Sequence, residues 1–120
     1  MAKVFNRDVE INGKLIRKVG AATAASGAAT LNASVGTVTS EALTTAQNAI
    51  YTLTITNDQV SADSVCLASV TDGTNTQGTP MVVRVTPADG SLVVTVANKH
   101  ATSQALNGTI KVNFSVTDVA

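Results

Sequence analysis

The side chains best suited to chemistry in this sequence are its single cysteine and its single histidine, Cys66 and His100. A thiol becomes a nucleophile when an adjacent imidazole removes its proton, and a carboxylate such as Asp72 could orient that imidazole. However, Cys66 lies inside the apolar run Ser64-Val-Cys-Leu-Ala68, where a cysteine behaves as a small hydrophobic residue. His100 lies in a polar loop segment. The spacing gives no support to a catalytic pair, and we predict that the protein is not an enzyme.

Metal and phosphate sites are weakly indicated. Asn57, Asp58, Asp63 and Asp72 offer the hard oxygens that calcium prefers, but they form no compact Asp-x-Asp-x-Asp-Gly loop. The glycine-bearing segment 72–78 lacks the lysine and the following helix that a phosphate site needs. A single cysteine excludes an intrachain disulfide and a paired zinc motif. We therefore predict no metal and no cofactor.

The elements that must position these residues are strands. Alanine, threonine and valine make up more than two fifths of the chain, and β-branched side chains favour pleated sheets. Alternation of apolar and polar residues predicts strands near 30–39, 49–56, 64–71, 80–86, 91–97 and 108–117. This alternation predicts that one set of side chains is buried: Tyr51, Leu53, Ile55, Val94, Val96, Ile110, Val112 and Phe114.

Turn signals separate these strands. They lie at 45–48, 72–78, 87–90 and 107–108, and all contain residues that preset or tolerate turn dihedrals. Six short strands with turns between them predict an all-β protein, an antiparallel β-sandwich of Greek-key or jelly-roll type.

The chain of 120 residues divides into two parts that differ in charge. Residues 1–20 carry five cations and two carboxylates, a net +3, whereas no lysine or arginine occurs from 21 to 83. The small residues of 20–27 suggest a linker. We therefore predict a basic N-terminal arm and linker, 1–26, and a sandwich domain, 27–120. Within the arm, Asn12-Gly13 between alternating segments predicts a hairpin over 9–16.

Several partner classes are disfavoured. The chain has no net charge at neutral pH and only three aromatic residues, whereas a nucleic-acid binder needs a basic surface and stacking faces. No apolar stretch approaches the length of a membrane span, and the N-terminus lacks the apolar run of a signal peptide. We expect no nucleic acid and no membrane as partners, and synthesis in the cytoplasm of the producing cell.

A family resemblance appears in the turn-and-strand motifs of the body. The segments 41–46, 51–57, 74–80, 90–98 and 105–114 are similar to a small β-sandwich domain of tailed-bacteriophage virion proteins, which include head decoration proteins and head or tail fibres. The resemblance covers residues 27–117. It implies a non-enzymatic virion surface module, usually trimeric, and it carries over no functional residues.

Two functions fit this resemblance. In the first, the protein is a capsid decoration or cement protein on the surface of the virion, expected to be a homotrimer that binds the major capsid protein through its arm. The expected docking residues alternate cations and apolar side chains: Lys3, Phe5, Arg7, Ile11, Lys14, Leu15, Arg17 and Lys18. In the second, the sandwich is a fibre, spike or tail-associated module that binds a receptor or glycan through the loops 72–79 and 98–107.

Overall fold

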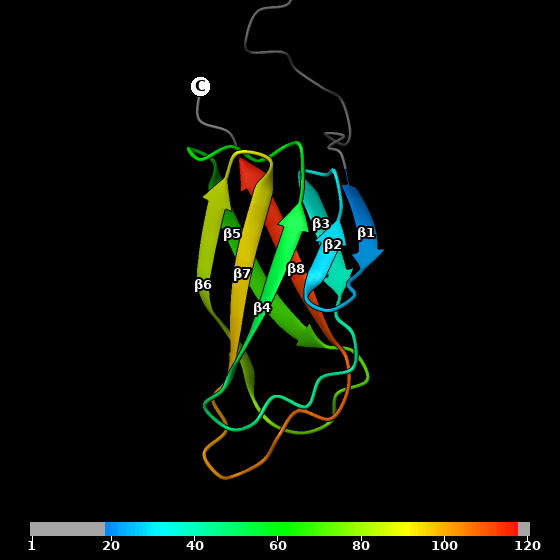
Figure 1. Ribbon diagram of the computed structural model, residues 1–120, viewed down its shortest axis with the longest axis vertical. Helices are drawn as coiled ribbons and strands as arrows, with labels where there is room; N and C mark the ends of the chain where they lie inside the picture. Colours follow the sequence, from blue (N-terminus) through cyan, green and yellow to red (C-terminus); the bar gives the residue numbers. More distant parts are fainter. Residues whose placement is uncertain (1–18, 118–120) are drawn as a thin grey trace, which may run out of the picture.

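The fold was analysed in a computed structural model that describes residues 19–117 (Figure 1). Residues 1–18 of the predicted arm, with the expected hairpin, lie outside the described residues, whereas the whole of the expected linker, 20–27, lies within them. Eight strands follow one another along the chain: β1 (Val19–Thr23), β2 (Ala28–Thr30), β3 (Val35–Thr39), β4 (Ile50–Thr56), β5 (Val65–Asp72), β6 (Pro80–Ala88), β7 (Ser91–Asn98) and β8 (Ile110–Thr117).

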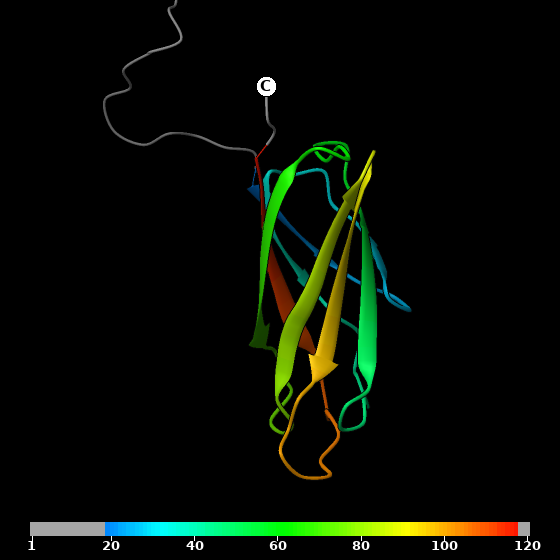
Figure 2. The ribbon, with the colours of Figure 1, turned by 90° about the vertical axis from the view of Figure 1, so that its left-hand side faces the viewer.

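The strands form two packed four-stranded sheets, which confirms the predicted all-β sandwich (Figures 1 and 2). We call the sheet with order β1-β3-β8-β5 sheet A and the sheet with order β2-β4-β7-β6 sheet B. Pairing is antiparallel except at two edges, where β1 pairs with β3 and β2 with β4 in parallel. Every connection crosses between the sheets except the β6–β7 hairpin. Crossing connections of this kind belong to Greek-key rather than meander topologies.

The core lies between the sheets and follows the predicted register. All eight side chains expected inside are buried, and Leu53, Ile55, Val94, Ile110 and Val112 have no exposed surface. Their neighbours Thr52, Thr54 and Lys111 point outward and are exposed, as the alternation requires. The register of the three central strands β4, β7 and β8 could therefore be predicted from the sequence alone.

The predicted linker at 20–27 is wrong. Residues 19–23 form β1 in sheet A, and Ala24 is buried in the core. Gly20 on β1 and Gly36 on β3 leave room for the side chain of Leu31 at this edge of the sandwich. A Cβ on Gly20 would lie 2.8 Å from Leu31 Cδ1, and one on Gly36 would lie 2.7 Å from Leu31 Cδ2. Glycine therefore serves close packing here and not flexibility.

A hydrogen-bonded brace holds the turn between β1 and β2 against sheet B. Tyr51 donates its hydroxyl hydrogen to Glu41 Oε1 at 2.8 Å, and the backbone N–H of Gly27 donates to Glu41 Oε2 at 2.8 Å. Gly27 adopts a φ of 75°, and a Cβ there would lie 2.7 Å from the Thr52 carbonyl oxygen. One carboxylate thus ties three segments together.

The brace predicts an alkaline dependence of stability that Tyr51→Phe removes. Burial, the hydrogen bond to Glu41 and the charge of Glu41 raise the pKa of Tyr51 well above its usual range. Unfolded chains lose the phenolic proton near pH ~10, whereas the folded protein keeps it, so the free energy of unfolding should fall as the pH rises above this value. Chemical denaturation at about pH 8 and about pH 11 should show a smaller decrease for the variant.

Tyr51→Phe should also cost about 1 kcal/mol near pH ~8, where the hydroxyl still donates to Glu41. Equal pH dependence in the two proteins would contradict the role of this hydroxyl.

Candidate docking surface

The described chain begins and ends at one end of the sandwich, which we call the terminal end (Figures 1 and 2). The expected docking residues Lys3, Phe5, Arg7, Ile11, Lys14, Leu15, Arg17 and Lys18 lie outside the described residues. The structure does establish where they attach, because β1 begins with Val19 at the terminal end. The loop 57–64 and the β6–β7 turn lie at the same end.

The terminal end is acidic. Asp58, Asp63 and Asp89 are all exposed in its loops. The cations of the described chain lie elsewhere: Arg84 on β6, Lys99 after β7 and Lys111 near the start of β8. The residues that precede Val19 carry a net +3. The basic segment is therefore attached, through Val19, to the acidic end of the sandwich.

A buried amide fixes the loops at the terminal end. Asn57 accepts a hydrogen bond from the Ala33 N–H at 3.1 Å and donates one to the Ala33 carbonyl at 2.8 Å. The Gln59 N–H donates to the same amide oxygen at 3.0 Å. The Asn57 N–H also donates to the Gly90 carbonyl at 2.9 Å. The acidic loops are thus held in one arrangement by a side chain that is fully buried.

An apolar patch lies on the outward face of sheet A, on the half nearer the terminal end. We call Val19, Val35, Val65 and Leu67 the terminal patch. Val19 and Leu67 are each 69% exposed and Val65 is 53% exposed. The strand registers place Val19, Val35, Ser115 and Leu67 in one row across the sheet. The patch is continuous in sequence with the N-terminal segment, because Val19 directly follows that segment.

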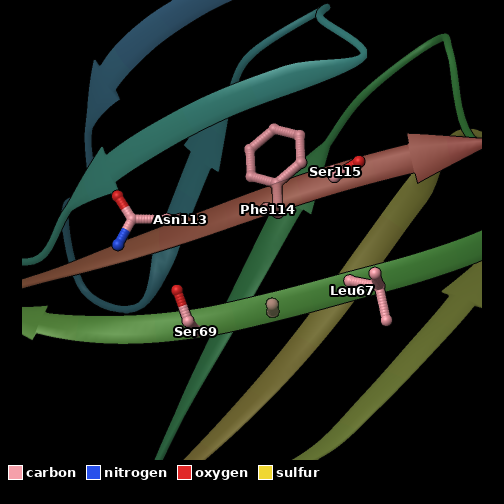
Figure 3. A pocket seen from close by; sticks show the side chains of 6 residues that line it. Leu67, Ser69, Asn113, Phe114 and Ser115 are labelled. Carbon is pink, nitrogen blue, oxygen red and sulfur yellow. The ribbon is translucent and has the colours of Figure 1, made fainter.

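A shallow hollow adjoins the terminal patch between β5 and β8 (Figure 3). Its lining contains Leu67, Ser69, Asn113 and Ser115, together with Ala68 and Phe114. Asn113 accepts a hydrogen bond from the Thr37 hydroxyl at 2.9 Å, so its amide oxygen is already engaged. The lining holds no titratable group. Such a surface suits apolar or hydroxyl-bearing side chains of a partner better than a charged ligand.

The opposite end of the sandwich carries the second loop cluster, which we call the loop end. Asn98 Nδ2 donates to the carbonyls of Thr45 and Gln104 at 3.0 and 2.8 Å, and Asn98 Oδ1 accepts from the Thr79 N–H at 3.0 Å. Asn75 is also buried and joins the 72–79 loop to the Asn107 N–H at 2.8 Å. The loops 72–79 and 98–107 therefore form one fixed platform.

The catalytic candidates are not brought together. Cys66 lies on β5 near the terminal end, half-buried and packed against the core. His100 lies at the loop end, where its Nδ1 accepts a hydrogen bond from the Thr102 N–H at 3.1 Å. Asp72 accepts a hydrogen bond from Asn75 Nδ2 at 3.0 Å. Cys66 and His100 are thus separated by most of the length of the sandwich (Figure 1).

Among residues 19–117, no three His, Cys, Asp or Glu side chains gather as a metal site would require. The calcium candidates are divided between the two ends, with Asn57, Asp58 and Asp63 in the loop before β5 and Asp72 at its far end. Within the same described range, no helix is long and apolar enough to cross a membrane.

Comparison with known proteins finds no matching family model, no similar curated protein and no similar solved structure.

The role of Asn57 can be measured by Asn57→Ala. This change leaves the Ala33 N–H and carbonyl without their side-chain partner in a buried position, so we expect the free energy of unfolding to fall by about 2–4 kcal/mol. Asn32→Ala is the matched control, because Asn32 is exposed and its side chain accepts one hydrogen bond, from the Asp58 N–H. The control should lose less than about 1 kcal/mol. Similar losses in urea denaturation would show that burial of the amide is unimportant.

Proposed function

We propose that the protein is a structural component of a bacteriophage virion, a capsid decoration or cement protein that binds the head surface and reinforces it. The observation that carries the proposal is the position of the N-terminal segment. This segment is basic and rich in apolar residues, and it joins the sandwich at an exposed apolar patch. A partner surface at the terminal end would contact the N-terminal segment and the terminal patch at the same time.

The major capsid protein is the proposed partner, and the apolar residues of the segment should contribute at least as much as its charges. Phe5, Ile11 and Leu15 alternate with cations in the segment. Burial of even ~300 Å² of apolar surface contributes several kcal/mol at ~25 cal/mol per Å². An exposed ion pair contributes ~1 kcal/mol or less. Self-association, as a homotrimer, would add avidity on a symmetric particle.

Removal of residues 2–16 tests the docking role of the segment. The deletion keeps β1 intact, and the described core lies entirely beyond it, so the truncated sandwich should fold with an unchanged thermal midpoint. Binding to undecorated particles, measured by co-sedimentation, should be lost. A folded truncated protein that still saturates the particles would overturn the assignment, and the docking surface would then have to lie on the sandwich.

Two sets of substitutions separate the electrostatic contribution to particle binding from the apolar contribution. The charge set is Lys3→Glu, Arg7→Glu and Lys14→Glu, and the apolar set is Phe5→Ser, Ile11→Ser and Leu15→Ser. We expect both sets to weaken particle binding, with the larger loss in the apolar set. The affinity of the protein with the charge set for particles should also depend less on salt concentration than the affinity of the unchanged protein. Equal salt dependence would argue against an electrostatic contribution.

A second function is a fibre, spike or tail-associated module that binds a receptor or glycan. The fixed platform at the loop end favours it, because preorganised loops bind at a lower entropic cost. The loops 72–79 and 98–107 contain no aromatic residue, however, and sugar recognition usually uses stacking faces. Copy number separates the two functions. Quantitative mass spectrometry of virions should find hundreds of copies for a capsid coat and at most a few dozen for a fibre or tail.

A further inference from the structure

The pair Asn107-Gly108 at the loop end consists of two residues that the packing requires. A Cβ on Gly108 would lie 2.5 Å from Thr74 Oγ1 and 2.8 Å from the Asn75 backbone nitrogen, so a larger residue would displace backbone. Asn107 Oδ1 accepts a hydrogen bond from the Thr76 N–H at 2.8 Å, and Asn107 Nδ2 donates to Thr76 Oγ1 at 2.8 Å. Both residues of the pair therefore hold the two loops of the platform together.

The same pair is chemically labile. In an unfolded chain, the backbone nitrogen of Gly108 can attack Cγ of Asn107, form a new C–N bond and expel the side-chain nitrogen as ammonia, which takes up the N–H proton. Water then opens the cyclic imide to aspartate or isoaspartate. A glycine after the asparagine favours this reaction, because a residue without a Cβ hinders ring closure least. The packing thus places an asparagine of the most reactive kind in a fixed loop.

The hydrogen bonds around Asn107 oppose ring closure. To bring Cγ onto the Gly108 nitrogen, both the side chain and the following peptide group must rotate, and the amide would then break its bonds to Thr76. The neighbouring backbone groups are also fixed. The Asn107 N–H donates to Asn75 Oδ1 at 2.8 Å, and the Gly108 carbonyl accepts from the Leu43 N–H at 2.9 Å. Rotation within the pair therefore breaks several hydrogen bonds of one network.

Further bonds between the same two loops strengthen this network. The regular pairing of β5 with β8 ends at Asp72 and Ile110. Beyond this point, Thr74 and Thr109 each donate a backbone N–H to the hydroxyl of the other at 2.9 Å. The Asn75 N–H also donates to the Thr109 carbonyl at 3.0 Å. Separation of the two loops has to break these bonds as well, so the open state of the loop end is rare.

We propose that the hydrogen bonds to Thr76 protect Asn107 from deamidation, so that the reaction occurs only when the loop end opens. The inference goes beyond the proposed function and does not depend on it. The reaction would also have a structural consequence, because a carboxylate at this position has no N–H to donate to Thr76 Oγ1. It would add a negative charge to the network in which Asn75 Nδ2 donates to Asp72 at 3.0 Å. Each opening that ends in reaction therefore loosens the platform permanently.

Peptide mapping by mass spectrometry of the full chain measures the reaction. Native protein and protein in concentrated urea are incubated in the same mildly alkaline buffer, and conversion at Asn107 is followed over time. Because each hydrogen bond opposes opening by roughly tenfold, the two bonds to Thr76 should slow the native reaction at least about a hundredfold. Asn12 also precedes a glycine and should convert as fast as Asn107 in urea, which makes it the internal reference. Equal rates at Asn107 in native and denatured protein would overturn the proposal.

Thr76→Val tests which contact protects the site. The variant keeps the N–H that donates to Asn107 Oδ1 but loses the hydroxyl that accepts from Nδ2, so conversion in the native protein should rise about tenfold. Thr102→Val is the matched control, because it also removes an exposed loop hydroxyl, which lies 3.1 Å from His100 Nδ1. The control should change the rate at Asn107 less than about twofold. Equal rates in the two variants would show that Thr76 does not protect Asn107.

Discussion

The interior of this sandwich is built almost entirely from Leu, Ile and Val, and that constraint determines the rest of the structure. Tyr51 and Phe114 are the only aromatic side chains in the described core. Small aliphatic side chains fill space only when alternate residues of every long strand point inward in register. The outward faces then combine threonine and serine with exposed apolar residues such as Val65 and Leu67, and they carry one lysine on β8 and one arginine on β6. Most of the remaining charges lie in the loops and in the N-terminal segment of the sequence.

Buried asparagines complete the structure at both ends, where the apolar core stops. Asn57 at the terminal end and Asn98 at the loop end are each fully buried, and each satisfies backbone groups of loops distant in the sequence. Among the described residues, no buried side-chain nitrogen or oxygen lacks a partner. Fully satisfied amides of this kind favour one loop arrangement, because every alternative leaves a buried polar group unpaired. Both ends are therefore shaped surfaces and not loose connections.

Period-two alternation was sufficient to predict the fold class and the buried face of the long strands, because a one-residue error would expose a whole apolar set, as at Leu53 and Ile55. The segment 20–27 was misread because alternation carries no signal in residues as small as glycine and alanine, and its role depends on Leu31. The brace of Tyr51, Glu41 and Gly27 could not be predicted, because a single carboxylate gives no indication of its partners. The acidic terminal end could not be predicted without the topology, which brings Asp58 and Asp63 of the β4–β5 loop to the same end as Asp89 of the β6–β7 turn. The docking residues of the arm remain a prediction.

The surface of the molecule divides by sheet and by end, and this division limits where a partner can be held. The β6 edge of sheet B contains Pro80, Pro87 and a bulge, whereas sheet A carries exposed apolar residues near the terminal end. The described chain begins at this same end, because β1 starts there with Val19. The loops 72–79 and 98–107 lie at the opposite end of the sandwich, where buried Asn98 and Asn75 hold them in place. A contact made at the terminal end would therefore leave these loops accessible, so the two ends of the molecule can be varied independently.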